Sequence, residues 1–182
     1  MVIAVSAVVL AIGAYGIYSG LIIKKNKVQE AFSGIDVQLK KRYDLMPNII
    51  AIAKKYMEHE REVFEKVTEL RTQALALSKE LSTASEKFQL DSQIQQLMKG
   101  IMVSVENYPQ LKADQAMLNA MNAYSDIEEH IAAARRFYNS AVNELNNAVE
   151  IFPSSVFAGL LGISKQAYFQ ASEVERQPVK FE

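Results

Sequence analysis

The sequence predicts an all-α protein, in which an N-terminal transmembrane helix continues into an elongated, up-and-down (antiparallel) four-helix bundle. Two observations favour this class. Residues 2–23 carry no charge, and apolar residues recur at alternating steps of three and four through most of the remaining chain, which is the period of a helix. No stretch alternates apolar and polar residues as a half-buried strand does, so we expect no sheet.

Composition limits the classes of function. The chain has 182 residues and a net charge of −1, which fits one domain plus an anchor and argues against a basic nucleic-acid-binding protein. Because the chain has no cysteine, a disulfide framework, a thiolate zinc site and a cysteine nucleophile are excluded.

Residues 2–23 are the predicted transmembrane anchor of a single-pass cell-membrane protein, since about 20 apolar residues cross the hydrocarbon core as a helix. A cleaved signal peptide is the main alternative, but no basic residue precedes the run as one does in such peptides. Lys24, Lys25 and Lys27 follow directly. Lysines beside a membrane helix favour the cytoplasmic side, so the bundle is predicted to be cytoplasmic.

Three glycines inside this run carry a second prediction. Gly16 and Gly20 form a G-x-x-x-G pair, with Gly13 one turn earlier. Their shared face has no side chains, so another membrane helix could approach it closely. The alternative interpretation is that glycine is simply frequent in membrane helices.

Residues 24–46 are predicted to form the first bundle helix, a stalk that leaves the membrane. Pro47 has no backbone N–H and disfavours helical geometry in the preceding residue, so we expect a turn or sharp kink there, with Asp44 as a nearby cap. A reversal of the chain at Pro47 and a kink within one long helix both stay open. The apolar stripe of this helix consists of Val28, Ala31 or Phe32, Ile35, Leu39, Tyr43 and Met46.

Heptad seams of the coiled-coil kind predict the other long helices, over residues 49–81, 90–105 and 117–152. Thr83 and Glu86 have the spacing of a capping box, which would start the third helix. Pro109 and Asp114 are expected to end that helix and to start the fourth.

The C-terminal part is predicted to break at Pro153, to form a short helix from about Ser155, and to end in an extended tail over residues 176–182. The chain is therefore divided into an anchor (1–23), a long-helix bundle (24–152) and a short helix with its tail (153–182). Apolar residues 156–161 could pack against the end of the bundle or lie on lipid, and both alternatives stay open.

Four segments resemble the LemA family in order along the chain: "AFSGIDVQLKKRYDLMPNI", "YPQLKA", "IAAARRFYNSAVNELNNAVEIFPSSVFAGLLG" and "PVKF". The resemblance implies a bacterial, membrane-anchored helical bundle from a family whose molecular function is largely unassigned. An aromatic residue is common in the family where Ala116 and Met117 stand here, so the start of the fourth helix departs from the pattern. The family motif falls on Ile35, Asp36, Val37, Gln38, Leu39, Arg42, Tyr43, Asp44, Pro47, Asn48, Tyr108, Pro109, Leu111, Lys112, Ala134, Arg135, Tyr138, Asn139, Phe152 and Pro153.

The search for catalytic chemistry finds no motif. His59 and Glu60 begin an H-E-x-x-H zinc signature, but Val63 stands where the second histidine is needed. Neither His59 nor His130 follows a glutamate at the spacing that di-iron bundles use. We therefore expect no enzyme, no cofactor and no metal site.

Charged residues near the seams are the remaining unusual feature. Glu60, Glu128 and Arg135 lie close to core-like positions, and Arg42 and Asp44 lie beside Pro47. Because buried charges must be paired, these residues predict either an ion-pair network that fixes helix register or, less simply, a ligand site.

The predicted function is a non-enzymatic, membrane-anchored scaffold or adaptor that forms a homo-oligomer, with or without other membrane proteins, and binds no nucleic acid. The alternative is a signalling or sensory module that transmits a change through a kink at Pro47. In that case His59, or Arg42 with Asp44, would be the trigger.

Overall fold

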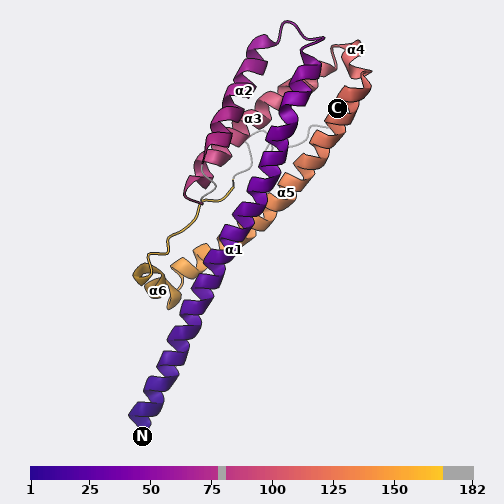
Figure 1. Cartoon of the computed structure of the whole chain (residues 1–182). Helices are drawn as coiled ribbons and strands as arrows, with labels where there is room; N and C mark the ends of the chain where they lie inside the picture. Colours follow the sequence, from indigo (N-terminus) through magenta and orange to yellow (C-terminus); the bar gives the residue numbers. More distant parts are fainter. Residues whose placement is uncertain (78–80, 170–182) are drawn as a thin grey trace, which may run out of the picture.

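The computed structural model describes residues 1–77 and 81–169, and every regular element in that part of the chain is helical (Figure 1). The predicted all-α class is confirmed. The α-helices are α1 (Val2–Ala53), α2 (Arg61–Ala76), α3 (Ala84–Val105), α4 (Pro109–Lys112), α5 (Gln115–Glu150) and α6 (Ser154–Leu160), with a 3₁₀ turn, η1 (Leu81–Thr83), before α3.

Helix α1 has two halves with opposite environments. Its N-terminal half projects alone from the molecule (Figure 1), and residues 1–13 are all exposed. At about 1.5 Å per residue the whole helix is roughly 78 Å long, and it is long and apolar enough to cross a membrane. From Leu21 onward, side chains at helical spacing are buried, among them Val28, Phe32, Ile35, Leu39 and Met46. Burial of each such side chain contributes roughly 1.5–3 kcal/mol.

Pro47 lies inside α1, so of the two alternatives the reversal there, with Asp44 as a cap, is wrong, and the chain continues as one long helix. Asp44 is an exposed mid-helix residue that pairs with Lys40 at 2.5 Å. The helix continues because Ile49, Ile50 and Ala53 extend its buried stripe by a further turn. The predicted single seam over residues 49–81 is consequently divided, and the chain turns back between α1 and α2.

A hydrogen bond from another helix compensates for the proline. Pro47 has no N–H to donate to the carbonyl four residues earlier, which is that of Tyr43. The Nε–H of Arg71, from α2, donates to this carbonyl oxygen at 2.6 Å. A tertiary contact thus supplies the donor that the helix itself lacks.

The helices pack with α1 along α5 and with α2 against α3, while α1 also contacts α2 and α3 (Figure 1). Two polar contacts show that α1 and α5 run antiparallel. Lys27 pairs with Glu144 at 2.8 Å, while Tyr56, just beyond the far end of α1, donates to Asp114 at 3.1 Å. An aromatic cluster of Phe32, Phe88, Tyr138 and Phe169 fills part of the core.

Several predicted helix boundaries are confirmed. Thr83 is the N-cap residue of α3, and Pro109 begins α4. Asp114 caps α5, where its Oδ1 accepts from the N–H of Ala116 at 2.8 Å and of Met117 at 3.1 Å. Helix α6 begins at Ser154, one residue before the expected start. The predicted tail, residues 176–182, lies outside the described residues.

After α6 the chain returns along α5 as an extended strap, residues 164–169. Asn146 accepts from the N–H of Gln166 at 2.9 Å and donates to its carbonyl at 3.0 Å. Asn139 does the same to Phe169, at 2.8 and 2.9 Å. The two asparagines lie seven residues apart on one face of α5. Each side-chain amide offers one acceptor and one donor, which bind the N–H and the C=O of a single strap residue.

Candidate functional site

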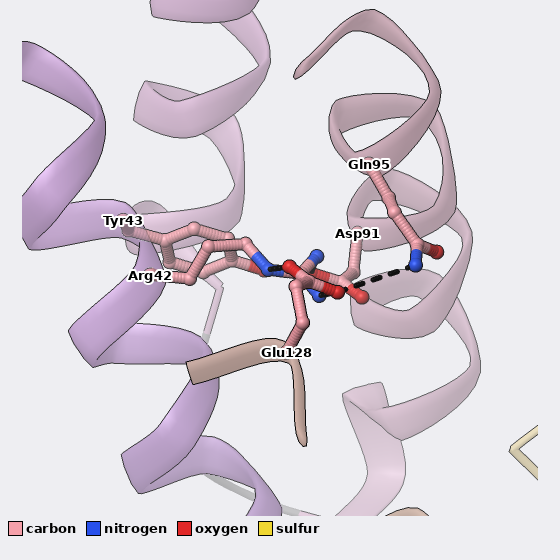
Figure 2. Close-up of polar contacts among 5 residues, drawn as sticks. All are labelled: Arg42, Tyr43, Asp91, Gln95 and Glu128. Carbon is pink, nitrogen blue, oxygen red and sulfur yellow. Dashed lines mark hydrogen bonds and ion pairs between the residues drawn. The ribbon is translucent and has the colours of Figure 1, made fainter. Parts of the chain in front are cut away.

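Arg42 of α1 is completely buried and lies between two carboxylates from different helices (Figure 2). Its Nη1–H donates to Oδ1 of Asp91, from α3, at 2.7 Å. On the other side, Nε lies 2.8 Å from Oε1 of Glu128, from α5, and Nη2–H donates to its Oε2 at 2.9 Å. One guanidinium therefore joins α1, α3 and α5 at a single level of the bundle.

Neighbouring polar groups complete this buried network. Tyr43 donates its hydroxyl to Oδ1 of Asp91 at 3.3 Å, and Gln95 donates Nε2–H to Oε2 of Glu128 at 3.3 Å (Figure 2). The two-sided guanidinium contact is one that lysine cannot reproduce, because a lysine presents a single compact charge.

Electrostatics at the site follow from burial and pairing. Burial alone would lower the pKa of Arg42, but the nearby acidic groups, first of all Asp91, outweigh it and raise that pKa. Arg42 is therefore charged. Burial raises the pKa of Asp91 and that of Glu128, and the charge of Arg42 opposes both shifts. The charge of Arg42 therefore stabilises the two ionised carboxylates, and this stabilisation opposes the free-energy cost of removing them from water.

A second buried pair lies further along the same two helices. Lys87 of α3, which is 3% exposed, contacts Asp36 of α1, with Nζ 2.5 Å from Oδ1. Along α1 the negative Asp36 comes before the positive Arg42. Along α3 the positive Lys87 comes before the negative Asp91, so each charge faces its opposite. A slip of α3 by one turn would bring Lys87 beside Arg42, so like charges would meet inside the core. The two pairs therefore specify the register of α3 against α1.

We call the connection of α1, α3 and α5 through Arg42, Asp91 and Glu128 the polar joint. Three cavities on the described surface have volumes of about 430, 410 and 140 Å³; Arg42, Asp91 and Glu128 line none of these three, whereas Asp36, Tyr43 and Lys87 line the smallest. Among residues 1–77 and 81–169, no group of three or more His, Asp or Glu side chains could hold a metal ion.

The predicted residues of the first motif divide into two faces of α1. Ile35 and Leu39 are buried, Asp36, Arg42 and Tyr43 take part in the polar pairs, and Gln38 is half-buried. Asp44, Pro47 and Asn48 lie on the exposed side of the helix. Arg42 and Asp44, which the sensory alternative names together, have different partners: Arg42 donates to Asp91, and Asp44 accepts from Lys40.

Four of the later motif residues lie in two places. Tyr108 donates to Glu60 at 3.1 Å beside Pro109, at the end of the bundle far from the anchor. Tyr138 and Asn139 bind the strap, where the Tyr138 hydroxyl donates to the carbonyl of Ala167 at 2.9 Å, and burial raises the pKa of Tyr138 to about 12.

The remaining predicted residues lie at different distances from the network, and Arg135 is near enough for its charge to oppose the rise that burial causes in the pKa of Asp91 and of Glu128. Arg135 lies 4.5 Å from the centre of the Phe169 ring, and Pro153 is exposed next to α6. Gly13 and Gly16 are exposed and Gly20 is half-buried, and a Cβ added at any of the three would meet nothing within 4 Å. His59 and His130 are exposed.

Asp91 and Lys87 were not among the residues predicted from the sequence. The predicted seam over residues 90–105 placed Leu90 and Leu97 in the core, and both are only half-buried. The buried positions of α3 are Ala84, Lys87, Phe88, Asp91, Ile94, Met98, Ile101 and Val105. Their three-and-four spacing is visible in the sequence, but a hydrophobic pattern assigns its charged members to the surface.

Comparison with known proteins yields a consistent set of relatives. A family model described as the LemA family matches residues 31–182. Protein LemA of Metamycoplasma hominis is 30% identical over 176 residues, which cover 94% of this chain and 79% of that protein. Magnetosome protein MamQ 2 of Paramagnetospirillum magneticum is 22% identical over 202 residues, covering 98% and 74%. Magnetosome protein MamQ of Magnetospirillum gryphiswaldense is 19% identical over 184 residues, covering 89% and 68%.

Proposed function

The chain belongs to the LemA family, and from this premise we propose that it is a membrane-anchored helical scaffold or adaptor without catalytic activity of its own. It assembles with itself or with other membrane proteins. The bundle is an up-and-down arrangement in which the C-terminal half of α1 packs with α2, α3 and α5.

One observation carries this proposal. Helix α1 is a single helix from Val2 to Ala53 that is uncharged and exposed over residues 2–13 and contributes buried side chains to the core from Leu21 onward. Because the anchor and the core share one helix, the bundle is joined to the anchor without a flexible linker. Such an element suits a protein that presents a fixed surface to its partners.

The polar joint supports the same function. A buried ion pair is a poor source of net stability, and its best-attested use is to select one register or one arrangement. Arg42, Asp91 and Glu128 serve this purpose by fixing three long helices at one level. A scaffold needs this fixed geometry more than it needs a large unfolding free energy.

The sensory alternative depends on Pro47 acting as a hinge. The carbonyl of Tyr43, which lacks a donor because of Pro47, accepts a hydrogen bond from Arg71 of α2. This bond ties the weakened turn of α1 to α2 and so opposes bending there. A sensor would also change its assembly with pH or with a ligand, whereas a scaffold would not.

The mass of the full-length protein in mild detergent, measured by light scattering and corrected for bound detergent, tests the proposal. We expect a discrete oligomer whose mass does not change between pH 5 and pH 8, roughly the range in which histidine titrates. A monomer at all concentrations would exclude self-assembly, and a mass that changes with pH would favour the sensory alternative.

We place the bundle in the cytoplasm because Lys24, Lys25 and Lys27 follow the anchor directly. Val103 of α3 is 61% exposed, and the chain has no cysteine, so Val103→Cys gives a single reactive thiol. A membrane-impermeant thiol reagent should modify it only after the cells are permeabilised. Modification in intact cells would place the bundle outside.

A further inference from the structure

Helix α6 and its flanking residues expose a concentrated group of large apolar side chains, which we name the α6 patch. A soluble surface rarely carries so many neighbouring apolar groups without a partner. The members and their exposed fractions are Ile151 (60%), Phe152 (79%), Val156 (54%), Leu160 (80%) and Leu161 (40%).

The segment around the patch is apolar on both faces. Residues 151–163 include no charged side chain. The opposite face of α6 packs on the bundle, where Ala158 is fully buried and Phe157 and Ile163 join the core. The segment is therefore fixed to the bundle by one face while the other stays unpartnered.

The position of α6 along α1 follows from the pairing of α1 with α5. Lys27 of α1 contacts Glu144 of α5 at 2.8 Å. From Glu144, α5 continues for six residues to its end at Glu150. Because both helices rise by the same distance per residue and run antiparallel, Glu150 lies at the level of the residue six positions before Lys27 in α1, which is Leu21. Leu21 is 1% exposed, and Ile17 is half-buried. Helix α6 follows there and contacts α1 where the lone part of that helix begins (Figure 1).

This position lies within the uncharged run of α1. The run over residues 2–23 rises roughly 33 Å at about 1.5 Å per residue, close to the hydrocarbon thickness of about 30 Å. Residues 17–21 therefore lie roughly 3–9 Å inside the end of the run. Helices that lie in the membrane interface bury their apolar face to a depth of about 5–10 Å.

We propose that the α6 patch is a second membrane contact, inserted into the interfacial region of the same lipid leaflet that surrounds the last turns of the anchor. The inference rests on the proposed function in one respect, namely that α1 spans the membrane. With α1 in place, acyl chains lie at the level of the patch, so lipid covers it without a protein partner. Two contacts instead of one then set the tilt of the bundle relative to the bilayer.

Single spin labels measure this placement directly. Leu160→Cys reports on the patch, Val9→Cys on the anchor, and Val103→Cys on the side of the bundle away from the membrane; all three side chains are well exposed, so labels should not disturb packing. The labelled full-length protein is reconstituted into vesicles of phosphatidylcholine and phosphatidylglycerol. Electron paramagnetic resonance then compares accessibility to oxygen, which concentrates in lipid, with accessibility to a water-soluble nickel chelate.

We expect the labels at positions 160 and 9 to favour oxygen and the label at position 103 to favour the nickel chelate. A label at position 160 that favours the chelate, while that at position 9 favours oxygen, overturns the inference but leaves the anchor intact. If both favour the chelate, the proposed membrane anchor fails as well. Spin–spin broadening at position 160 would show that a second copy covers the patch, and this also overturns the lipid contact.

Discussion

At the scale of single residues, Arg42 is the side chain whose environment departs most from its chemistry. A guanidinium without solvent contact needs compensating charges, and Asp91 and Glu128 provide them from two other helices. Removing one member of the network should therefore destabilise the protein much more than removing all three. Removal of one leaves an uncompensated buried charge, whereas removal of all three leaves no unpaired ion in the core.

We expect Arg42→Ala to lower the free energy of unfolding by about 3–5 kcal/mol, because Asp91 and Glu128 lose their shared counter-charge. The triple change Arg42→Met, Asp91→Leu, Glu128→Met should cost much less. Thermal unfolding in mild detergent, followed by circular dichroism, provides the measurement, and Arg61→Ala, an exposed arginine with an i,i+4 partner, is the control. An Arg42→Ala variant as stable as the control would show that the joint is not required.

The cap residue Asp114 gives the molecule a defined response to acid. The N–H of Met117 and the hydroxyl of Tyr56 lower the pKa of this carboxyl below its usual range. Folding therefore gains stability from the ionised Asp114 above its unfolded pKa of about 3.9, and this gain is lost as the pH falls through the lower folded value.

We expect Asp114→Ala to melt at a lower temperature than the parent protein at pH 7, and the difference to shrink as the pH is lowered below about 4. Asp114→Asn is the matched control, since asparagine caps helices as well as aspartate does but does not titrate. Melting temperatures measured across this pH range test the point. A gap between Asp114→Ala and the parent that stays constant down to pH 2 would contradict the assigned role of the charge.

At the scale of elements, the long α1 shows how tertiary contacts overrule a local signal. Proline in a helix interior costs about 3 kcal/mol or more, through a lost hydrogen bond and a steric clash. Here the orphaned carbonyl of Tyr43 accepts from Arg71 instead, and the burial of Ile49, Ile50 and Ala53 favours continuation of the helix. The turn therefore comes after Ala53.

This explanation predicts coupling between Pro47 and Arg71. Arg71→Ala should destabilise the parent protein by about 1–3 kcal/mol, because a carbonyl on a buried residue loses its charged donor. In the Pro47→Ala background the restored N–H satisfies that carbonyl, so the same change should cost less. A double-mutant cycle of unfolding free energies measures the difference. Strict additivity would show that Arg71 does not replace the missing donor.

At the scale of the whole molecule, the glycine face of the anchor and the bundle joined to it together suggest how copies would assemble. An added Cβ at Gly13, Gly16 or Gly20 meets nothing within 4 Å, so these glycines are not required by packing within one chain. A requirement for them would therefore arise between chains.

We expect Gly16→Leu with Gly20→Leu to reduce the mass of the detergent-solubilised assembly, because bulky side chains separate the helix backbones. Ala7→Leu with Ala11→Leu, exposed residues on the opposite face of the same helix, is the matched control and should leave the mass unchanged. An assembly that survives the glycine change would remove the G-x-x-x-G interpretation and leave assembly to the bundle faces.

The sequence by itself determined the all-helical class, the apolar N-terminal run and the helix starts at Thr83, Pro109 and Asp114. These features depend on local chemistry: helical periodicity, the absence of charge, the fit of proline to a first helical turn, and the Asp114 side chain that accepts from nearby backbone N–H groups. The same reasoning found the core positions of α5, such as Ile131, Tyr138 and Leu145, because they are apolar at regular spacing.

The tertiary structure alone decided the path through Pro47, the burial of Lys87 and Asp91, and the height of α6 beside the anchor. Each depends on a partner far away in sequence. Arg71 supplies a donor to the carbonyl of Tyr43, Arg42 and Asp36 supply counter-charges, and the pairing of Lys27 with Glu144 sets the offset of two helices. A pattern that records only the character of each residue contains no information about which distant residue will face it.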